Sequence, residues 1–111
     1  MDKLEKYRQI IKQVLIEYAA IPYKYGDITS ELIISQDENR FILITQGWEN
    51  NTRVHGCLIH LDIINEKIWV QRDGTEDGIV TDLEAAGIPK SDMVLAFHPQ
   101  HLRKYTKYAV N

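Results

Sequence analysis

Apolar residues recur every three or four positions through the first 20 residues, which predicts an amphipathic helix over residues 2–20. The stripe consists of Leu4, Tyr7, Ile10, Ile11, Val14, Leu15 and Tyr18. Asp2 is a suitable N-cap, because its carboxylate can accept hydrogen bonds from the free amides of the first turn. Pro22 and Gly26 indicate the end of this helix and the loop that follows it.

The pattern then changes to alternating and β-branched residues, which is typical of strands. It predicts four of them, at residues 32–36, 40–48, 53–64 and 67–71. Short polar turns separate consecutive strands, at residues 37–39, 49–51 and 65–66. Turns this short require antiparallel neighbours. In the third strand, strict alternation places Cys57 with Ile59 and Leu61 on one face, and His60 with Asp62 on the other.

The last third of the chain predicts a second helix over residues 78–86, followed by an extended apolar segment at 93–97. Gly87 and Pro89 form the usual helix stop, and Asp77 or Thr75 is expected to cap the helix start. Pro99 is suited to open a final helical turn. Because the first helix must bury its stripe against a sheet, we predict an α+β fold in which both helices pack on one side of an antiparallel, mainly meander sheet of four or five strands.

Composition agrees with one globular domain spanning residues 1–111, since 44% of the residues are hydrophobic and 26% are charged. The single cysteine, Cys57, favours a reducing compartment, and we expect a cytoplasmic protein without a membrane segment. With 13 basic against 16 acidic residues, the chain lacks the excess of Lys and Arg typical of proteins that hold DNA alone. One alternative function remains open here, a weak DNA-binding module that uses Arg103, Lys104 and Lys107.

Residues 73–84, with the sequence DGTEDGIVTDLE, partly fit a calcium-binding loop. Asp73, Asp77, Gly78 and Glu84 fit the template, but Thr75 does not, and a strand precedes the loop instead of a helix. We therefore interpret the segment as a strand-to-helix turn. The histidine pair His98 and His101 has a helical spacing, and His60 with Asp62 could supply further ligands. Because nothing in the sequence brings the two pairs together, we expect no metal and no cofactor.

A second alternative is a metal-dependent nuclease or other hydrolase that uses His60, Asp62 and Asp73 on the polar face of the sheet. Gln71 would line the same face. However, any two neighbouring strands with a solvated side produce such a set by chance, and no serine or glycine-rich loop has the context of a catalytic motif. We expect no catalytic residue, and a binding role.

Three ordered blocks of residues resemble the XisI-like family of fdxN element excision controlling factors. The blocks are Gly47-Trp48 with RVHGC at 53–57 and HLDI at 60–63; KIWVQRDGTE at 67–76; and GIPKSDMVLAFHP at 87–99 with Arg103, Tyr105 and Thr106. The similarity extends from the first helix to Ala109-Val110.

This resemblance implies an accessory role in the excision of a DNA element during heterocyst differentiation in cyanobacteria. In that setting a separate site-specific recombinase cuts and joins the DNA, and a companion protein, XisH, acts with the XisI-like protein. We therefore expect an XisH-like partner, only indirect or weak contact with DNA, and no membrane. The family supplies no catalytic residue to carry over.

The surface that we expect to contact a partner comprises Asp73, Gly74, Thr75, Glu76, His98, Pro99 and Arg103, because these turn residues combine carboxylates, an imidazole and a guanidinium. The alternative reading is that they only fix the two corners of the fold, with Arg103 paired to a carboxylate. A homodimer is also expected, since four strands leave two unpaired sheet edges.

Overall fold

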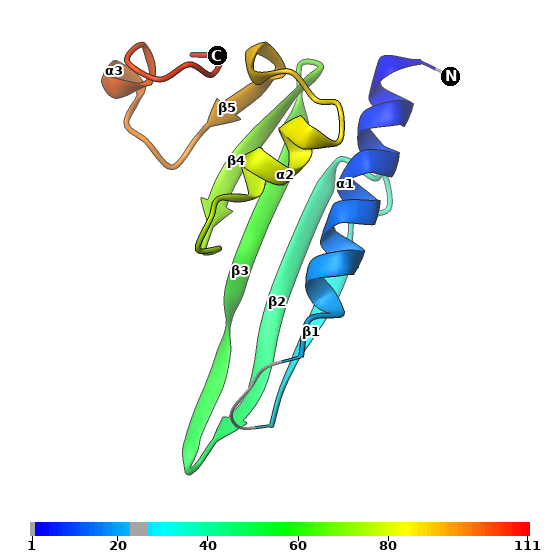
Figure 1. Ribbon diagram of the computed structural model, residues 1–111, viewed down its shortest axis with the longest axis vertical. Helices are drawn as coiled ribbons and strands as arrows, with labels where there is room; N and C mark the ends of the chain where they lie inside the picture. The colour runs from blue at the N-terminus through cyan, green and yellow to red at the C-terminus, as the bar shows by residue number, and fades with distance from the viewer. Residues whose placement is uncertain (1, 23–26) are drawn as a thin grey trace.

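A computed structural model describes residues 2–22 and 27–111 of the chain (Figure 1). The order of elements is α1 (Lys3–Ala19), β1 (Asp27–Ile34), β2 (Arg40–Glu49), β3 (Thr52–Ile64), β4 (Lys67–Asp73), α2 (Ile79–Ala85), the 3-10 turn η1 (Lys90–Asp92), β5 (Met93–Leu95) and α3 (Gln100–Arg103). The loop residue Gly26, expected after the first helix, lies outside the described residues.

The five strands form one sheet in the order β1-β2-β3-β4-β5. Neighbours from β1 to β4 are antiparallel, as their short turns require, whereas β5 runs parallel to β4 because the chain returns through α2. The predicted α+β fold with a mainly meander sheet is confirmed. The first strand begins earlier than predicted, at Asp27, because its alternation of exposed and covered residues starts there.

Both helices cover the same face of the sheet, and the core lies between the two layers (Figure 1). The stripe predicted for α1 contributes Tyr7, Ile11, Val14 and Leu15 to this core, opposite Phe41, Leu43, Ile59 and Leu61 of the central strands. The residues predicted to begin α1 and to end α2 do so in the structure. The Asp2 carboxylate accepts a hydrogen bond from the Glu5 amide at 2.8 Å, and Gly87 follows α2 with a φ of 119°.

A β-bulge corrects the predicted faces of the third strand. Ile44 pairs with Cys57 while Leu43 pairs with Ile59, so Leu58 is an extra residue in β3. Cys57 therefore does not share a face with Ile59 and Leu61; it lies on the opposite side of the sheet. Its thiol is half-buried and contacts the Ile59 carbonyl, and burial raises its pKa.

We call the side of the sheet that faces away from α1 and α2 the open face. The residues that project from it are Asp27, Thr29, Glu31 and Ile33 of β1, Arg40, Ile42, Ile44, Gln46 and Trp48 of β2, Arg53, His55, Cys57, His60, Asp62 and Ile64 of β3, and Lys67, Trp69, Gln71 and Arg72 of β4. None of the isoleucines on this face joins the core under the helices.

The β2–β3 hairpin projects beyond the end of α1 and makes the molecule elongated, with extents of 42 × 34 × 24 Å (Figure 1). Its tip carries Trp48, which is 51% exposed, beneath the guanidinium of Arg53 at 5.5 Å. Among residues 2–22 and 27–111, no helix has the length and apolar character needed to cross a bilayer.

Two tyrosines of α1 tie the helix to the second half of the chain. The Tyr7 hydroxyl donates to Asp92, and the Tyr18 hydroxyl donates to Asp82 Oδ2 at 2.5 Å. Desolvation by burial, assisted by the adjacent carboxylates, raises the pKa of both phenols from 10.0 to about 12. Because deprotonation is harder in the folded state, the contribution of the neutral phenols is complete below about pH 10 and is lost as the pH rises toward 12.

We expect the double variant Tyr7→Phe/Tyr18→Phe to lose less of its remaining stability than the parent between about pH 9 and 11.5, because it lacks both titrating groups. Urea midpoints measured across this range test the expectation. Tyr105→Phe is the matched control, since Tyr105 is 76% exposed and should leave the slope unchanged. Equal slopes for the parent and the double variant would contradict the assignment.

Candidate functional site

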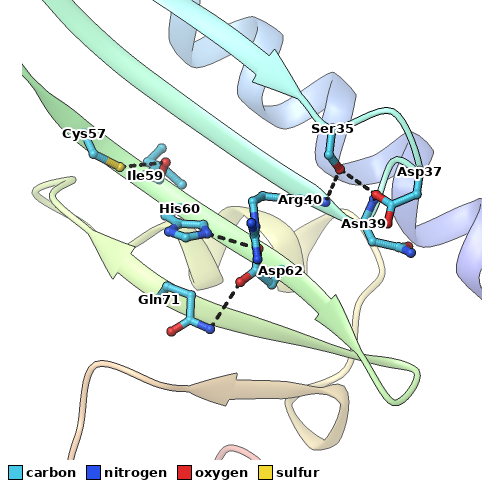
Figure 2. Close-up of polar contacts among 9 residues, drawn as sticks. All are labelled: Ser35, Asp37, Asn39, Arg40, Cys57, Ile59, His60, Asp62 and Gln71. Atoms are coloured by element: carbon cyan, nitrogen blue, oxygen red, sulfur yellow. Dashed lines mark hydrogen bonds and ion pairs between the residues drawn. The ribbon is translucent and has the colours of Figure 1, made fainter.

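A cluster of polar side chains surrounds Asp62 on the open face (Figure 2). Asp62 Oδ1 accepts hydrogen bonds from Arg40 Nε at 3.0 Å and contacts His60 Nε2 at 3.0 Å, while Oδ2 accepts one from Gln71 Nε2 at 3.3 Å. The carboxylate is 6% exposed, so its partners offset the cost of its burial. Antiparallel pairing of β2, β3 and β4 brings these four residues together.

The cluster does not provide the hydrolase site considered from the sequence. His60, Asp62 and Gln71 do share a face, but Asp73 pairs in register with the buried Ile59 and bonds toward α2, on the helix side of the sheet. Both oxygens of Asp62 are already engaged by neighbouring side chains. Within the described ranges, no three His, Cys, Asp or Glu side chains gather in a way that could hold a metal ion.

The turn after β4 is organised by Asp73. Its Oδ1 accepts hydrogen bonds from the Thr75 amide at 3.0 Å and from the Thr75 hydroxyl, and its Oδ2 accepts one from the Ile79 amide at 2.7 Å. Asp73 therefore satisfies a free amide at the start of α2. The expectation that Asp77 or Thr75 caps this helix is wrong: the cap residue is Gly78, and the Asp73 carboxylate accepts from the Ile79 amide from the end of β4.

The second predicted segment, around His98, Pro99 and Arg103, is also held by internal contacts. Arg103 Nε donates to the His98 carbonyl at 3.1 Å, its Nη2 donates to the Ala96 carbonyl at 3.3 Å, and its guanidinium lies 5.5 Å from the Trp69 ring centroid. Arg103 thus holds α3 to the segment at 96–98 through backbone carbonyls and not through the expected carboxylate, with its guanidinium beside Trp69 of β4. His98 is half-buried and its ring lies 4.6 Å from that of Phe97.

The contacts of Arg103 also affect the basic cluster formed by Arg103, Lys104 and Lys107 near the C-terminus. Arg103 is occupied by backbone carbonyls and the Trp69 ring, which leaves Lys104 and Lys107 as its exposed cations. Lys104 lies over the ring of Tyr105 at 5.2 Å. Of the three cations considered from the sequence for contact with DNA, Lys104 and Lys107 therefore remain exposed to solvent.

A groove of about 1180 Å³ lies between α1, the bulged segment of β3 and the turn that leads into α2. Its apolar lining residues include Ile10, Val14, Leu58 and Ile21, of which Val14 is buried and Ile21 is 58% exposed. We call it the α1–α2 groove. Three of the predicted partner-contacting residues line it, namely Gly74, Thr75 and Glu76, whereas His98, Pro99 and Arg103 belong to a separate part of the surface.

Acidic side chains dominate the charge around the α1–α2 groove. The lining includes the carboxylates of Glu17, Glu76, Asp77 and Asp82, with Lys6 as its cation among the described residues. Glu76, Asp77 and Glu17 are exposed, so they are free to meet a charged ligand. The contribution of α1 was missed from the sequence, although the row Gln9, Gln13 and Glu17 beside the apolar stripe gave a signal for it.

Comparisons with known proteins agree with the resemblance seen in the sequence. The family model described as XisI protein matches residues 1–110. A solved XisI-like protein from Anabaena variabilis is 32% identical to this chain with a TM-score of 0.88, covering 97% of this chain and 99% of its own.

A second solved structure, of the fdxN element excision controlling factor XisI from Anabaena variabilis, is also 32% identical. Its TM-score is 0.80, and the match covers 99% of this chain and 100% of that one. No curated protein sequence matches the chain. Family match, identity and fold agree over nearly every residue, and the chain belongs to the XisI family.

Proposed function

We propose that this protein is an accessory factor that controls excision of the fdxN element and acts through protein partners without breaking DNA itself. The family match supports this role, as does the 32% identity to a solved protein named for that activity. The carboxylate of Asp62 supports the second half of the proposal, because its hydrogen bonds to Arg40 and Gln71 suit a structural group better than a reacting one.

The partner that fits this role is an XisH-like protein, which would connect the chain to a site-specific recombinase during heterocyst differentiation. We place its contact at the α1–α2 groove. The observation that carries this placement is the combination of apolar lining residues with an acidic rim formed by the exposed Glu17, Glu76 and Asp77. Such a groove attracts a protein segment with an apolar stripe flanked by Lys or Arg, such as a basic amphipathic helix.

The same charges argue against nucleic acid at this site, because the carboxylates of Glu17, Glu76 and Asp77 would repel a phosphate backbone. Contact with DNA would then be indirect, through the recombinase. Asp73 supports the groove by holding the turn that carries Glu76, so its role is to position the rim.

Reversing two rim charges tests this placement. We expect Glu76→Lys/Asp77→Lys to weaken binding of a purified XisH-like protein about tenfold in calorimetry or a pull-down, with a lower association rate and less dependence on salt. Both residues are exposed, so the fold should persist.

Glu66→Lys is the matched control, since Glu66 is exposed in the β3–β4 turn and does not line the groove. It changes the net charge in the same direction and should leave the affinity unchanged. Equal loss in both variants would indicate a general charge effect, and an unaffected rim variant would remove the groove from the interface.

A further inference from the structure

The open face carries an apolar centre that α1 and α2 leave uncovered. Ile33, Ile42 and Ile44 project from neighbouring positions on β1 and β2; Ile33 is 47% exposed, and the other two are half-buried. Nearby, no helix of the described residues lies over the projecting β2–β3 hairpin (Figure 1). A strand ribbon is marginally stable in water unless a second layer packs on it.

Charge is unevenly divided across the open face. On one side, β1 presents Glu31, which is exposed. On the other side, β3 and β4 present Arg53 and Arg72, also exposed, together with His55. Between these two sides, Arg40 and Asp62 form an ion pair at 3.0 Å, so their charges offset each other. The face thus has an acidic side, an apolar centre and a basic side.

We propose that the open face is a two-fold interface with a second copy of this chain. A two-fold axis parallel to the strands, between β2 and β3, lays β1 of one sheet over β4 of the other. This arrangement sets the Glu31 side of each copy against the Arg72 side of its partner. The isoleucines of β2 then lie next to the axis over β3 of the other copy, and Trp48 approaches Arg53 of the other hairpin. The face is therefore complementary to itself.

The area is sufficient for a stable pair. Four strands spaced about 4.8 Å apart, with β2 about 33 Å long for its 10 residues, give a flat footprint of about 600 Å², apart from the Trp69 position of β4, over which Arg103 lies. Side chains that stand off a sheet expose more area than this footprint. A specific dimer buries about 800 Å² on each partner, so one open face provides surface of the required size.

This interface is independent of the α1–α2 groove, because it lies on the opposite side of the sheet. A dimer built in this way would leave both grooves exposed and would present two copies of the partner site. Failure of the dimer would therefore leave the proposed function untouched, and loss of partner binding would leave the dimer untouched.

Sedimentation equilibrium of the purified full chain tests the interface. We expect twice the 12.9 kDa chain mass for the parent protein. Ile42→Glu should be monomeric at the same concentration, with an unchanged circular dichroism spectrum. Ile16→Glu is the matched control: Ile16 is 53% exposed on α1, outside both surfaces, and its variant should remain dimeric.

A charge exchange provides a second readout. Glu31→Arg should dissociate the dimer by placing like charges opposite Arg72, and Glu31→Arg/Arg72→Glu should restore it. The two residues lie three strands apart within one chain, so restoration requires contact between chains. A monomeric parent protein, a dimer that tolerates Ile42→Glu and the exchange, or a face that instead binds an oligonucleotide or a different protein would each overturn the proposal.

Discussion

Replacing Gly47 with alanine is expected to lower the free energy of unfolding by more than about 2 kcal/mol, the largest effect expected for alanine at a glycine within residues 27–111. Gly47 has a φ of 148° in β2, and an added Cβ would lie 1.8 Å from the Asp27 carbonyl oxygen. The clash involves backbone, so no side-chain rotation relieves it. Strands β1 and β2 would have to separate where they pair.

Gly56→Ala is the matched control for this experiment. Gly56 lies on the neighbouring strand β3, but its added Cβ would meet nothing within 4 Å. Since glycine weakens a strand by about 0.5–1 kcal/mol relative to alanine, Gly56→Ala should be neutral or stabilising. Urea unfolding of both variants gives the comparison. Similar stabilities would contradict the close contact between Gly47 and Asp27.

Asp73→Ala is expected to lower the free energy of unfolding by about 1–3 kcal/mol, because it removes the acceptor for the Thr75 and Ile79 amides. The loss should concentrate at the start of α2, and hydrogen exchange at these amides should accelerate more than in β3. Asp73 would then act in partner binding only by holding the turn.

Asp77→Ala is the control for Asp73, because Asp77 is exposed and its carboxylate makes no bond to the amides of α2 in the described structure. Its stability should stay within about 0.5 kcal/mol of the parent. If Asp77→Ala were the more destabilising change, the calcium-loop or capping role first considered for that residue would regain support.

Periodicity predicted the elements of this fold because each buries one face. The apolar stripe of α1 and the alternation in β2 reflect the burial of one face of each element in a two-layer core. Gly87 and Pro89 mark the end of α2. The parallel pairing of β5 with β4 could not be predicted from the sequence, because a short apolar segment does not indicate the direction of the strand beside it.

The alternation of apolar and polar residues predicted the wrong face where one extra residue changes the strand register. Strict alternation placed Cys57 with Ile59, but the bulge at Leu58 moves Cys57 to the open face. Likewise, spacing within the turn pointed to Asp77 or Thr75 as the cap of α2, whereas Asp73 accepts from the Ile79 amide from the preceding strand. Neither a bulge nor a cap from outside the helix has a reliable signature in one sequence.

The candidate surfaces were predictable only in part. Gly74, Thr75 and Glu76 were singled out by their turn chemistry, and they do line the α1–α2 groove. The opposite wall comes from α1, more than 50 positions away in the chain, and only folding brings the two together. The open face needed the strand register before its acidic and basic sides could be recognised.

We propose that this chain controls excision through a protein partner and leaves DNA cleavage to another protein. A reporter plasmid that carries the element, in a host supplied with the recombinase and the XisH-like protein, measures this directly. We predict excision with the parent chain, loss of excision with Glu76→Lys/Asp77→Lys, retention with Glu66→Lys, and no strand breaks when the chain acts alone. Strand cleavage by the purified chain with Mn²⁺, abolished by Asp62→Asn, would contradict the account.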